Sequence, residues 1–344
     1  MAGTSLWDYI FIRASIFLLH LIAPLSVAYS LVSLLARLPF QFPRVLQAWL
    51  SLEALFYLVV YLPLNKYLQR AAKHPVPPCR ADRRKLFLKC HNNIPDPAQY
   101  LRKWFRNAPV SEIKRDNVKD FFWWAFLNTG DHDSTYDEEL EEYTQEIEKL
   151  LGKKLEPGRG NAKCLRLTLE KPLTLTVERY GSVVAAQLLR SPEVSQHIGP
   201  ALFIDPVSFL LHLPDVAYNF ICRRPSQPNE YLLSYFGSKD IGIAHTLFRR
   251  FFWADNLLWK EDIRDHPVTV VLAGRDSVID TKAIRAYLLG SDNWTLETTD
   301  LRDFGQKGDR LDVVWFQDLD HGQVFDEKRT RSSLVEIVWT FCKK

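Results

Sequence analysis

The sequence predicts an α/β protein with a mostly parallel sheet and a helical cap, preceded by an N-terminal transmembrane helical hairpin and a small helical region. Three observations lead to this prediction. Two long apolar runs lie within residues 1–66, helical patterns and a basic linker fill residues 67–157, and short β-rich runs alternate with helical patterns through residues 158–344. Strands that alternate with helices are typical of a parallel sheet wound with crossover helices.

The composition of the 344-residue chain narrows the possible partners. A formal net charge of +3 is too small to indicate a nucleic-acid partner. The cysteines form no C-x-x-C pair and no Cys/His cluster, so we expect no disulfide framework, no metal site and no cofactor. There are five of them, spread over the chain: Cys79, Cys90, Cys164, Cys222 and Cys342.

The first apolar run, residues 14–36, contains no Asp, Glu, Lys or Arg. As a helix it is long enough to cross about 30 Å of hydrocarbon. Pro24 and His20 are tolerable inside a bilayer helix that has neighbours. We expect His20 to be neutral and hydrogen-bonded locally rather than a proton or ligand site.

The second apolar run, residues 46–64, carries Glu53 near its middle. A carboxylate inside a membrane is costly, so a helix lying on the membrane surface is the alternative to a second span. Prolines within residues 39–43 supply a turn, which favours a hairpin of two spans. Aromatic residues that can anchor this run at the interface follow at three positions: Trp49, Tyr57 and Tyr61.

A basic stretch follows the second run. Between residues 66 and 89, eight Lys and Arg residues stand against the single acidic residue Asp82. By the positive-inside rule, we expect an integral membrane protein with a two-span anchor and a cytoplasmic C-terminal body. The same residues suit anionic head groups, so membrane lipids are the expected partners. A secretory signal peptide is the competing interpretation, but the length of the first run and the presence of the second oppose cleavage.

The helical region combines an aromatic block at residues 121–126 with an acidic helix that Gly152 ends. We expect the aromatic block to pack in a core, although a lipid-contacting surface is the alternative. Beyond it, we expect strands and helices in alternation. The expected strands cover residues 164–169, 172–177, 200–205, 268–273 and 311–316, and the expected helices cover residues 182–190, 207–263, 281–288 and 332–341.

Two loops at the ends of expected strands hold residues that are suited to acid–base catalysis. Asp276 follows the strand at 268–273, and His321 follows the strand at 311–316. A buried carboxylate that accepts a hydrogen bond from the imidazole Nδ1–H orients that imidazole as a general base. Asp276 could instead cap the next helix. Asp205, which follows its own strand and precedes a proline, is the alternative acid.

Three stretches occur in the order elbow, acid, histidine: "VERYGSVVAAQLL", "LAGRDSVID" and "LDHGQVF". In this order they resemble the C-terminal half of an α/β-hydrolase, in which G-x-S-x-G carries the nucleophile. The resemblance covers residues 172–344, and residues 207–263 resemble the helical cap of that family. With its membrane segments, the chain is similar to the membrane-anchored members found in fungal proteomes. The resemblance implies an esterase-like, serine-dependent hydrolysis of a hydrophobic ester or lipid ligand.

The elbow departs from the family pattern. Aligning Gly181 with the last glycine of the motif places Val177 on the first glycine and Arg179 on the serine. An arginine cannot act as the acyl-accepting nucleophile. Ser182 lies three residues later, in the first turn of the expected helix, and we expect it to point away from the site.

The sequence also lacks the oxyanion loop and the stretch of chain that would contain it. No H-G-G-type loop precedes the elbow, and "HIGP" at His197 comes after it. Only residues 153–178 stand between the acidic helix and Arg179, where the family pattern has several strand–helix units. One hypothesis is therefore an internally deleted hydrolase with an incomplete catalytic triad. The alternative is a non-catalytic, membrane-tethered module that binds a lipid or a protein, for which the aromatic run at residues 249–259 is the motivation.

Overall fold

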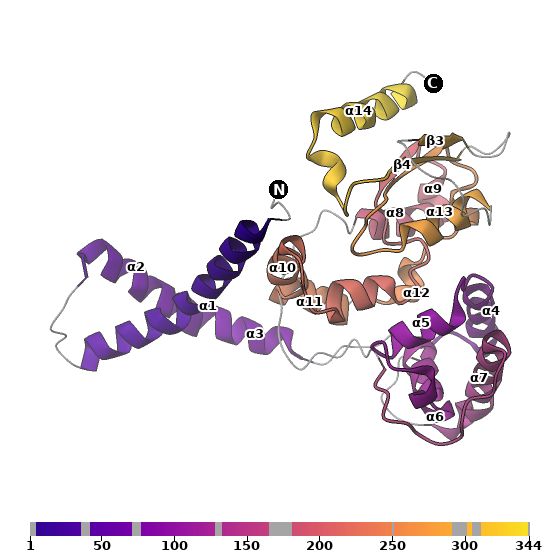
Figure 1. Cartoon of the computed structure of the whole chain (residues 1–344), viewed down its shortest axis with the longest axis horizontal. Helices are drawn as coiled ribbons and strands as arrows, with labels where there is room; N and C mark the ends of the chain where they lie inside the picture. The colour runs from indigo at the N-terminus through magenta and orange to yellow at the C-terminus, as the bar shows by residue number, and fades with distance from the viewer. Residues whose placement is uncertain are drawn as a thin grey trace. The chain divides into compact units, whose positions relative to one another are not determined.

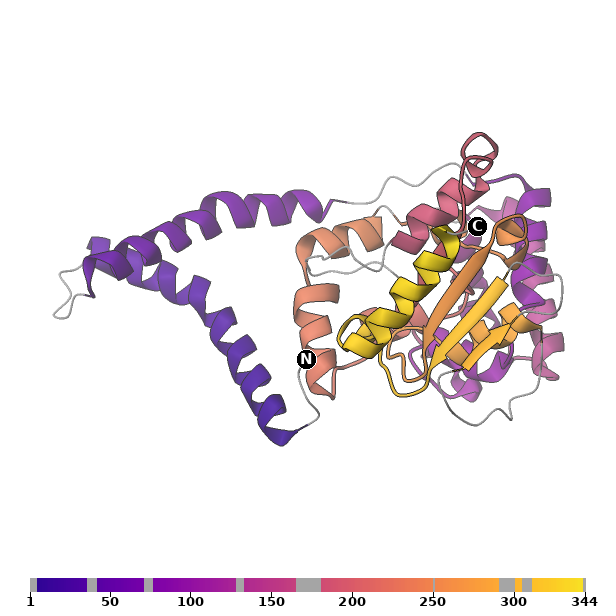
Figure 2. The ribbon, with the colours of Figure 1, turned by 90° about the horizontal axis from the view of Figure 1, so that it is seen from above.

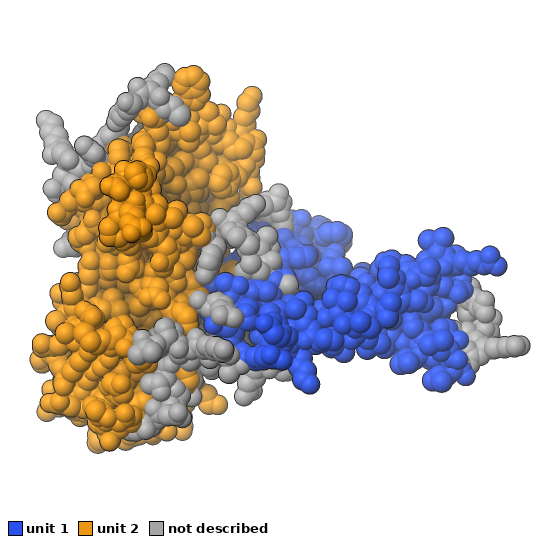
Figure 3. Space-filling model, turned by 180° about the vertical axis from the view of Figure 1, so that it is seen from behind, with its two compact units in different colours: residues 1–73, 168–176, 224–250 blue, residues 74–167, 177–223, 251–344 orange. Residues whose placement is uncertain are grey.

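A computed structural model describes most of the chain (Figure 1). The described residues are 5–35, 42–70, 77–127, 133–164, 181–249, 251–290, 301–304 and 311–342. They divide into two compact units (Figure 3). We call the first the hairpin unit, with residues 1–73, 168–176 and 224–250, and the second the body unit, with residues 74–167, 177–223 and 251–344. The division runs through the expected cap, residues 207–263.

The hairpin unit contains two helices that are long and apolar enough to cross a membrane. The first is α1 (Leu6–Leu35); the second runs without a break from Arg44 to Leu68 through α2 (Arg44–Leu55), η1 (Phe56–Tyr61) and α3 (Leu62–Leu68). They have 30 and 25 residues, and about 20 helical residues suffice to span a bilayer. The two expected apolar helices are thus confirmed. His20 bonds through Nδ1 to the Ile16 carbonyl oxygen at 2.7 Å, which is the expected local contact.

Three further elements lie among the described residues of the hairpin unit. Helices α10 (Pro228–Leu233) and α11 (Ile241–Arg249) are joined by the π-helical turn η7 (Ser234–Ser238). Helix α10 packs against α1, and α11 packs against α3. Figure 2 shows these helices at the open end of the V that the two long helices form. A stretch that the sequence groups with the hydrolase-like part therefore belongs structurally with the apolar helices.

The helical region of the body unit has its own aromatic core. Phe87 stacks on Tyr143 with ring centroids 4.1 Å apart, and Phe122 and Phe126 pack around this pair. The aromatic block therefore lies in a core, as expected, because its large side chains exclude water from one shared interior. Gly152 ends the acidic helix with a φ of +65°, a value that favours glycine. The elements here are α4 (Arg80–His91), α5 (Pro97–Trp104), η2 (Val110–Glu112), α6 (Arg115–Phe122), η3 (Trp123–Leu127), η4 (Ser134–Tyr136) and α7 (Asp137–Leu151).

The sheet of the body unit has the order β1-β2-β4-β3. Strands β1 (Ala201–Ile204), β2 (Val268–Ala273) and β4 (Leu311–Phe316) are parallel, while β3 (Leu301–Phe304) is antiparallel to β4. The prediction of a mostly parallel sheet is confirmed. The expected strands at 164–169 and 172–177 lie outside the described residues, apart from Cys164, which belongs to no strand.

Strands β2 and β4 are buried on both faces. Val271, Val314 and Phe316 face helix α14 (Lys328–Cys342), while Val270 and Val313 on the opposite face have no exposed surface. Burial on both faces explains why these strands read as continuous apolar runs. The remaining described elements are α8 (Gly181–Arg190), α9 (Pro192–Ser195), η6 (Val216–Cys222), α12 (Trp253–Asn256), η8 (Lys260–Ile263), α13 (Thr281–Leu289) and η9 (Gln323–Phe325).

The helical region docks onto loops that follow the parallel strands. Lys103 of α5 forms an ion pair with Asp215, in the segment after β1. One turn away, the Tyr100 hydroxyl donates to Asp280, in the loop after β2, at 3.1 Å. Burial, with the nearby Asp280 carboxylate, raises the pKa of Tyr100, so this hydroxyl keeps its proton and donates it. Helix α5 thus contacts the segments that follow β1 and β2.

Candidate active site

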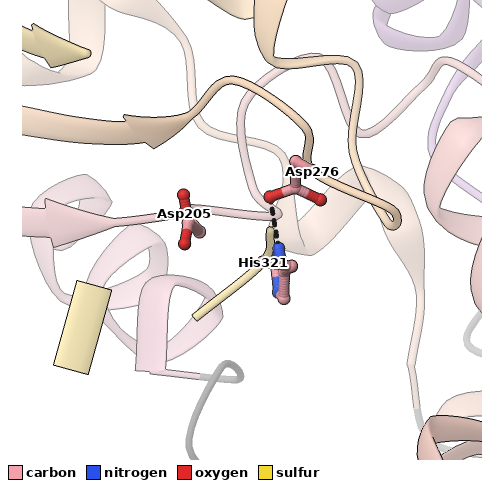
Figure 4. A group of neighbouring side chains, drawn as sticks. All are labelled: Asp205, Asp276 and His321. Carbon is pink, nitrogen blue, oxygen red and sulfur yellow. Dashed lines mark hydrogen bonds and ion pairs between the residues drawn. The ribbon is translucent and has the colours of Figure 1, made fainter. Parts of the chain in front are cut away.

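Asp276 and His321 meet at the carboxyl end of the sheet, as the order of the strands predicts. Strands β2 and β4 are parallel neighbours, so the loops that follow Ala273 and Phe316 leave the same edge. The Nδ1 atom of His321 lies 2.5 Å from Oδ2 of Asp276 (Figure 4). The two side chains are 2% and 0% exposed. The structure therefore holds a buried carboxylate–imidazole pair.

The two loops are tied together by their backbones. Gly274 N–H donates to the Phe316 carbonyl at 2.7 Å, and Arg275 N–H donates to the Leu319 carbonyl at 2.9 Å. A Cβ atom at Gly274 would lie 2.4 Å from the carbonyl oxygen of Gln317. Only glycine allows this close approach, since the clashing atom is backbone and cannot swing aside. The distance between the acid loop and the histidine loop is thereby fixed.

Asp276 uses its two carboxylate oxygens for different tasks. Oδ1 accepts hydrogen bonds from the backbone N–H groups of Val278 and Ile279, at 2.7 and 2.9 Å. Oδ2 faces His321. The cap of the next helix, α13, is Asp280, whose side chain accepts from the first turn of that helix. Asp276 is therefore fixed by its own loop and directed at the imidazole.

Asp205 is the third member of the cluster. It follows β1, and the functional atoms of Asp205, Asp276 and His321 all lie within 4.8 Å of one another. Its carboxylate accepts from the N–H groups of Ala273 at 2.8 Å and Gly322 at 2.7 Å. Asp205 thus bridges the ends of the other two loops. Burial raises its pKa, and the Asp276 charge adds to this effect while His321 opposes it.

The alternative acid is therefore placed differently from Asp276. The carboxylate that accepts from the imidazole Nδ1–H is that of Asp276, whereas both oxygens of Asp205 accept from backbone N–H groups. Asp205 has a φ of +43°, a backbone conformation that costs free energy for a residue with a side chain. The bridging hydrogen bonds account for its persistence.

Asp320 is a site residue that the sequence analysis does not identify. Its Oδ1 accepts from Ser277 N–H at 2.8 Å and from His321 N–H at 2.7 Å. It therefore links the residue after the acid to the histidine itself. The only signal in the sequence is an acidic residue directly before the histidine in "DLDHGQ", and such residues are common in loops.

Ser182 lies in the first turn of α8, as expected. Its hydroxyl oxygen accepts a hydrogen bond from the buried Ser208 hydroxyl at 3.1 Å. This contact joins α8 to the segment after β1. Arg179, which occupies the serine position of the elbow, lies outside the described residues.

The cluster has two possible chemistries. Two carboxylates and one imidazole are donor types that divalent metals accept. Here, however, Asp205 and Asp276 already accept four backbone N–H bonds between them, and Asp276 also holds the imidazole. This bonding suits a fixed acid–base pair better than an ion. An imidazole that donates through Nδ1–H presents Nε2 as the base.

Comparisons with known proteins add no relative: no family model, curated protein or solved structure matches the chain.

Proposed function

We propose that the chain is a membrane-anchored, α/β-hydrolase-like protein and that Asp276 and His321 are the acid and base of an ester-hydrolysis site. The observation that carries this proposal is the buried 2.5 Å contact between His321 Nδ1 and Asp276 Oδ2. The order of parallel strands supports it. With α8 before β1, the acid after β2 and the histidine after β4, the chain follows the order elbow, acid, histidine of that family.

The pair has a definite role in this chemistry. An ionised Asp276 can only accept, so the imidazole carries its proton on Nδ1 and offers Nε2. Nε2 takes a proton from the oxygen that attacks the ester carbonyl and then returns it to the departing alkoxide. Asp276 stabilises the imidazolium that forms between the two steps and keeps the ring in place.

The proposed site lacks the serine that supplies the attacking oxygen in the α/β-hydrolase family. Arg179 stands where the family has its serine, and a guanidinium cannot form an acyl-enzyme. We therefore expect His321 to activate water, without a covalent intermediate. General-base catalysis typically supplies about 10²- to 10⁴-fold, well below the acceleration by a complete triad with an oxyanion hole. The proposed family activity is accordingly impaired in this chain.

The apolar helices point to the class of substrate. A protein anchored by two such helices meets esters that partition into lipid, such as acyl lipids, at high local concentration. We further propose that the body lies on the cytoplasmic side, because the basic residues after the second helix favour that side.

The proposal is tested by hydrolysis of a medium-chain p-nitrophenyl ester by the full chain in lipid nanodiscs. We expect slow hydrolysis that falls at least about tenfold in His321→Gln, which lacks a titratable base. The matched control is His197→Gln, because His197 is an exposed histidine of the same body unit. Equal rates for the wild type and His321→Gln would contradict the proposal.

Equal rates would instead favour the second candidate, a non-catalytic module that binds a lipid or protein. The aromatic run that motivates this candidate is partly committed to packing. Leu257, Leu258 and Trp259 are buried, and Leu257 and Trp259 form a cluster with Leu211 and Cys90. A lipid retained by purified His321→Gln protein would then identify the ligand class.

A further inference from the structure

Residues 224–249, which we call the crossbar segment, contain α10, η7 and α11 and belong to the hairpin unit. We propose that the crossbar segment lies in the head-group region of the membrane and contacts lipid through Phe236. This inference rests on the proposed membrane anchor, but not on the proposed hydrolysis. The occupant of this surface is a lipid bilayer, and the argument starts from the contacts of the segment with the two long helices.

One end of the crossbar segment is bound to the start of α1. The Arg13 guanidinium donates to the Tyr231 hydroxyl at 3.3 Å and lies 5.0 Å from the centre of that ring. The Tyr231 ring also meets the Tyr9 ring edge-on, with centroids 5.6 Å apart. Further along, Tyr235 meets His20 at 5.0 Å. These contacts place α10 and η7 beside the N-terminal half of α1.

The other end is bound to the end of α3. His245 bonds through Nδ1 to the Leu68 carbonyl at 3.2 Å, and the Arg249 guanidinium donates to the Arg70 carbonyl at 3.0 Å. Carbonyls in the last turn of a helix have no partner within that helix, and inside or beside lipid they need one. The crossbar segment supplies such a partner to Leu68, the last residue of α3, and a further one to Arg70 just beyond the helix.

The contacts at its two ends define the depth of the crossbar segment in the membrane. In a hairpin of two spans, the start of the first helix and the end of the second lie at the same membrane face. The crossbar segment joins these two ends, as Figure 2 shows for the hairpin unit. Tyrosine and arginine are enriched at that level because their rings and stems suit the acyl boundary while their polar ends reach water. Tyr9, Arg13 and Tyr231 form such a group.

The segment also has the two-sided character of an interfacial helix. Ile241 and Ile243 are 5% and 2% exposed, whereas Phe236 is 54% exposed. The Phe236 ring contacts Tyr235, which in turn contacts His20 of α1, and Phe17, one helical turn before His20, is 63% exposed. An exposed phenylalanine continuous with a lipid-facing helix is best placed in the same lipid.

The test places a photoreactive benzoylphenylalanine at position 236 of the full chain. The protein is reconstituted in vesicles of phosphatidylcholine and phosphatidylserine that contain radiolabelled lipid. Two matched positions with apolar side chains serve as references: Val59, which is 61% exposed in the second long helix, and Val335, which is 57% exposed in α14 of the body unit. We expect lipid adducts at 236 and 59 and a several-fold lower yield at 335.

Each other outcome has a definite meaning. Adducts at 59 but not at 236 would overturn the crossbar proposal and leave the membrane anchor standing. No adduct at 59 would overturn the anchor itself, and with it the crossbar proposal. Equal yields at 236 and 335 would also overturn the proposal, because the label would then not distinguish the hairpin unit from the body unit.

Discussion

The carboxylate of Asp276 does two jobs that usually compete. One oxygen satisfies two backbone N–H groups of its own loop, and this removes the freedom of the side chain to rotate. The other oxygen is then held at His321 without further ordering cost, since the loop has already fixed it. The geometry of the pair thus follows from the loop rather than from the histidine.

The substitution Asp276→Asn tests whether Asp276, rather than the neighbouring Asp205, is the acid that bonds His321. The amide keeps the shape of the side chain but lacks the charge that stabilises an imidazolium, so we expect ester hydrolysis to fall by about tenfold or more. The strongly downfield proton resonance that a short carboxylate–imidazole bond produces should also disappear. Both effects are measured on the full chain in nanodiscs, by the hydrolysis assay and by proton NMR. Retention of the resonance in Asp276→Asn would show that another group bonds Nδ1.

Asp205→Asn is the comparison. An amide can accept at one end only, so it cannot hold both the Ala273 and the Gly322 N–H groups. We expect a loss of about 1–3 kcal/mol in stability, the usual cost of one buried unsatisfied group, with the His321 resonance retained. Loss of the resonance without a loss in stability would reverse the assignment and make Asp205 the acid.

His212 gives a prediction on pH. Burial lowers the pKa of His212 from 6.5 to about 4, with its Nε2 bonded to the Asn93 carbonyl at 3.2 Å and its ring on Trp259. In the unfolded chain His212 takes up a proton near pH 6.5, whereas in the folded protein it stays neutral down to about pH 4. The stability that neutral His212 contributes above pH 6.5 is therefore lost as the pH falls from 6.5 towards 4. The loss amounts to about 3 kcal/mol at most.

The measurement is the thermal midpoint of the full chain in detergent at pH 7 and at pH 4.5. His212→Phe has no titrating group, so we expect a smaller decrease between the two pH values than for the wild type. His197→Gln, an exposed control, should decrease as the wild type does. A decrease in His212→Phe as large as in the wild type would show that other groups account for the acid sensitivity.

Some site residues can be found from sequence and others cannot. Asp276 and His321 each follow an apolar strand, in the order acid and then histidine, so the sequence pattern alone identifies them as candidates. Asp320, through its carboxylate, and Gly274, through its missing side chain, each contact the backbone of the other loop, 43 residues away in the chain for Asp320 and Ser277. Such contacts depend on which strands are neighbours, and no local pattern in one sequence encodes that.

At the scale of elements, a buried ion pair joins helices α4 and α7. The Arg83 guanidinium bonds both oxygens of the Glu139 carboxylate, at 2.9 and 2.6 Å, with both side chains at most 6% exposed. The Tyr143 hydroxyl donates to the same carboxylate at 2.6 Å. Although burial opposes ionisation, these bonds prevail and hold the pKa of Glu139 below its ordinary value.

Arg83→Ala should cost about 3–5 kcal/mol of stability, because it leaves the Glu139 charge buried without its partner. The control is the next residue of the same helix. Arg84 pairs with Glu142 at 2.7 Å, but its side chain is 57% exposed, so Arg84→Ala should cost less than about 1 kcal/mol. Denaturant unfolding of both variants in detergent gives the comparison. Equal effects would mean that burial does not set the strength of these pairs.

The elements themselves differ in how well the sequence predicts them. Strands β2 and β4 are runs of Val, Leu and aromatic residues buried on both faces, so they stand out. Strand β3, "LRDF", is half charged and is formed only by pairing with β4. The expected helical stretch 207–263 contains short helices that tertiary contacts assign to two different units.

At the scale of the molecule, the chain combines an apolar hairpin unit with an α/β body unit. Cys79, an exposed cysteine in the basic stretch after the second long helix, reports on the orientation of the body. An impermeant maleimide should modify Cys79 only from the cytoplasmic face of sealed vesicles, and Cys79→Ser should remove that modification. Burial raises the pKa of Cys90, which makes this second thiol slow to react. Modification of Cys79 from the opposite face would reverse the proposed topology.

For the whole molecule, the proposal is that this chain keeps the acid and the base of a hydrolase site but lacks its nucleophile. The most direct measurement is labelling of the full chain in nanodiscs with a fluorophosphonate probe, followed by mass mapping of modified peptides. We expect no labelled serine, because Arg179 occupies the elbow position and Ser182 accepts a hydrogen bond from Ser208 instead. Labelling of Ser182 in the wild type that disappears in His321→Gln would overturn this proposal, since it would show a complete triad.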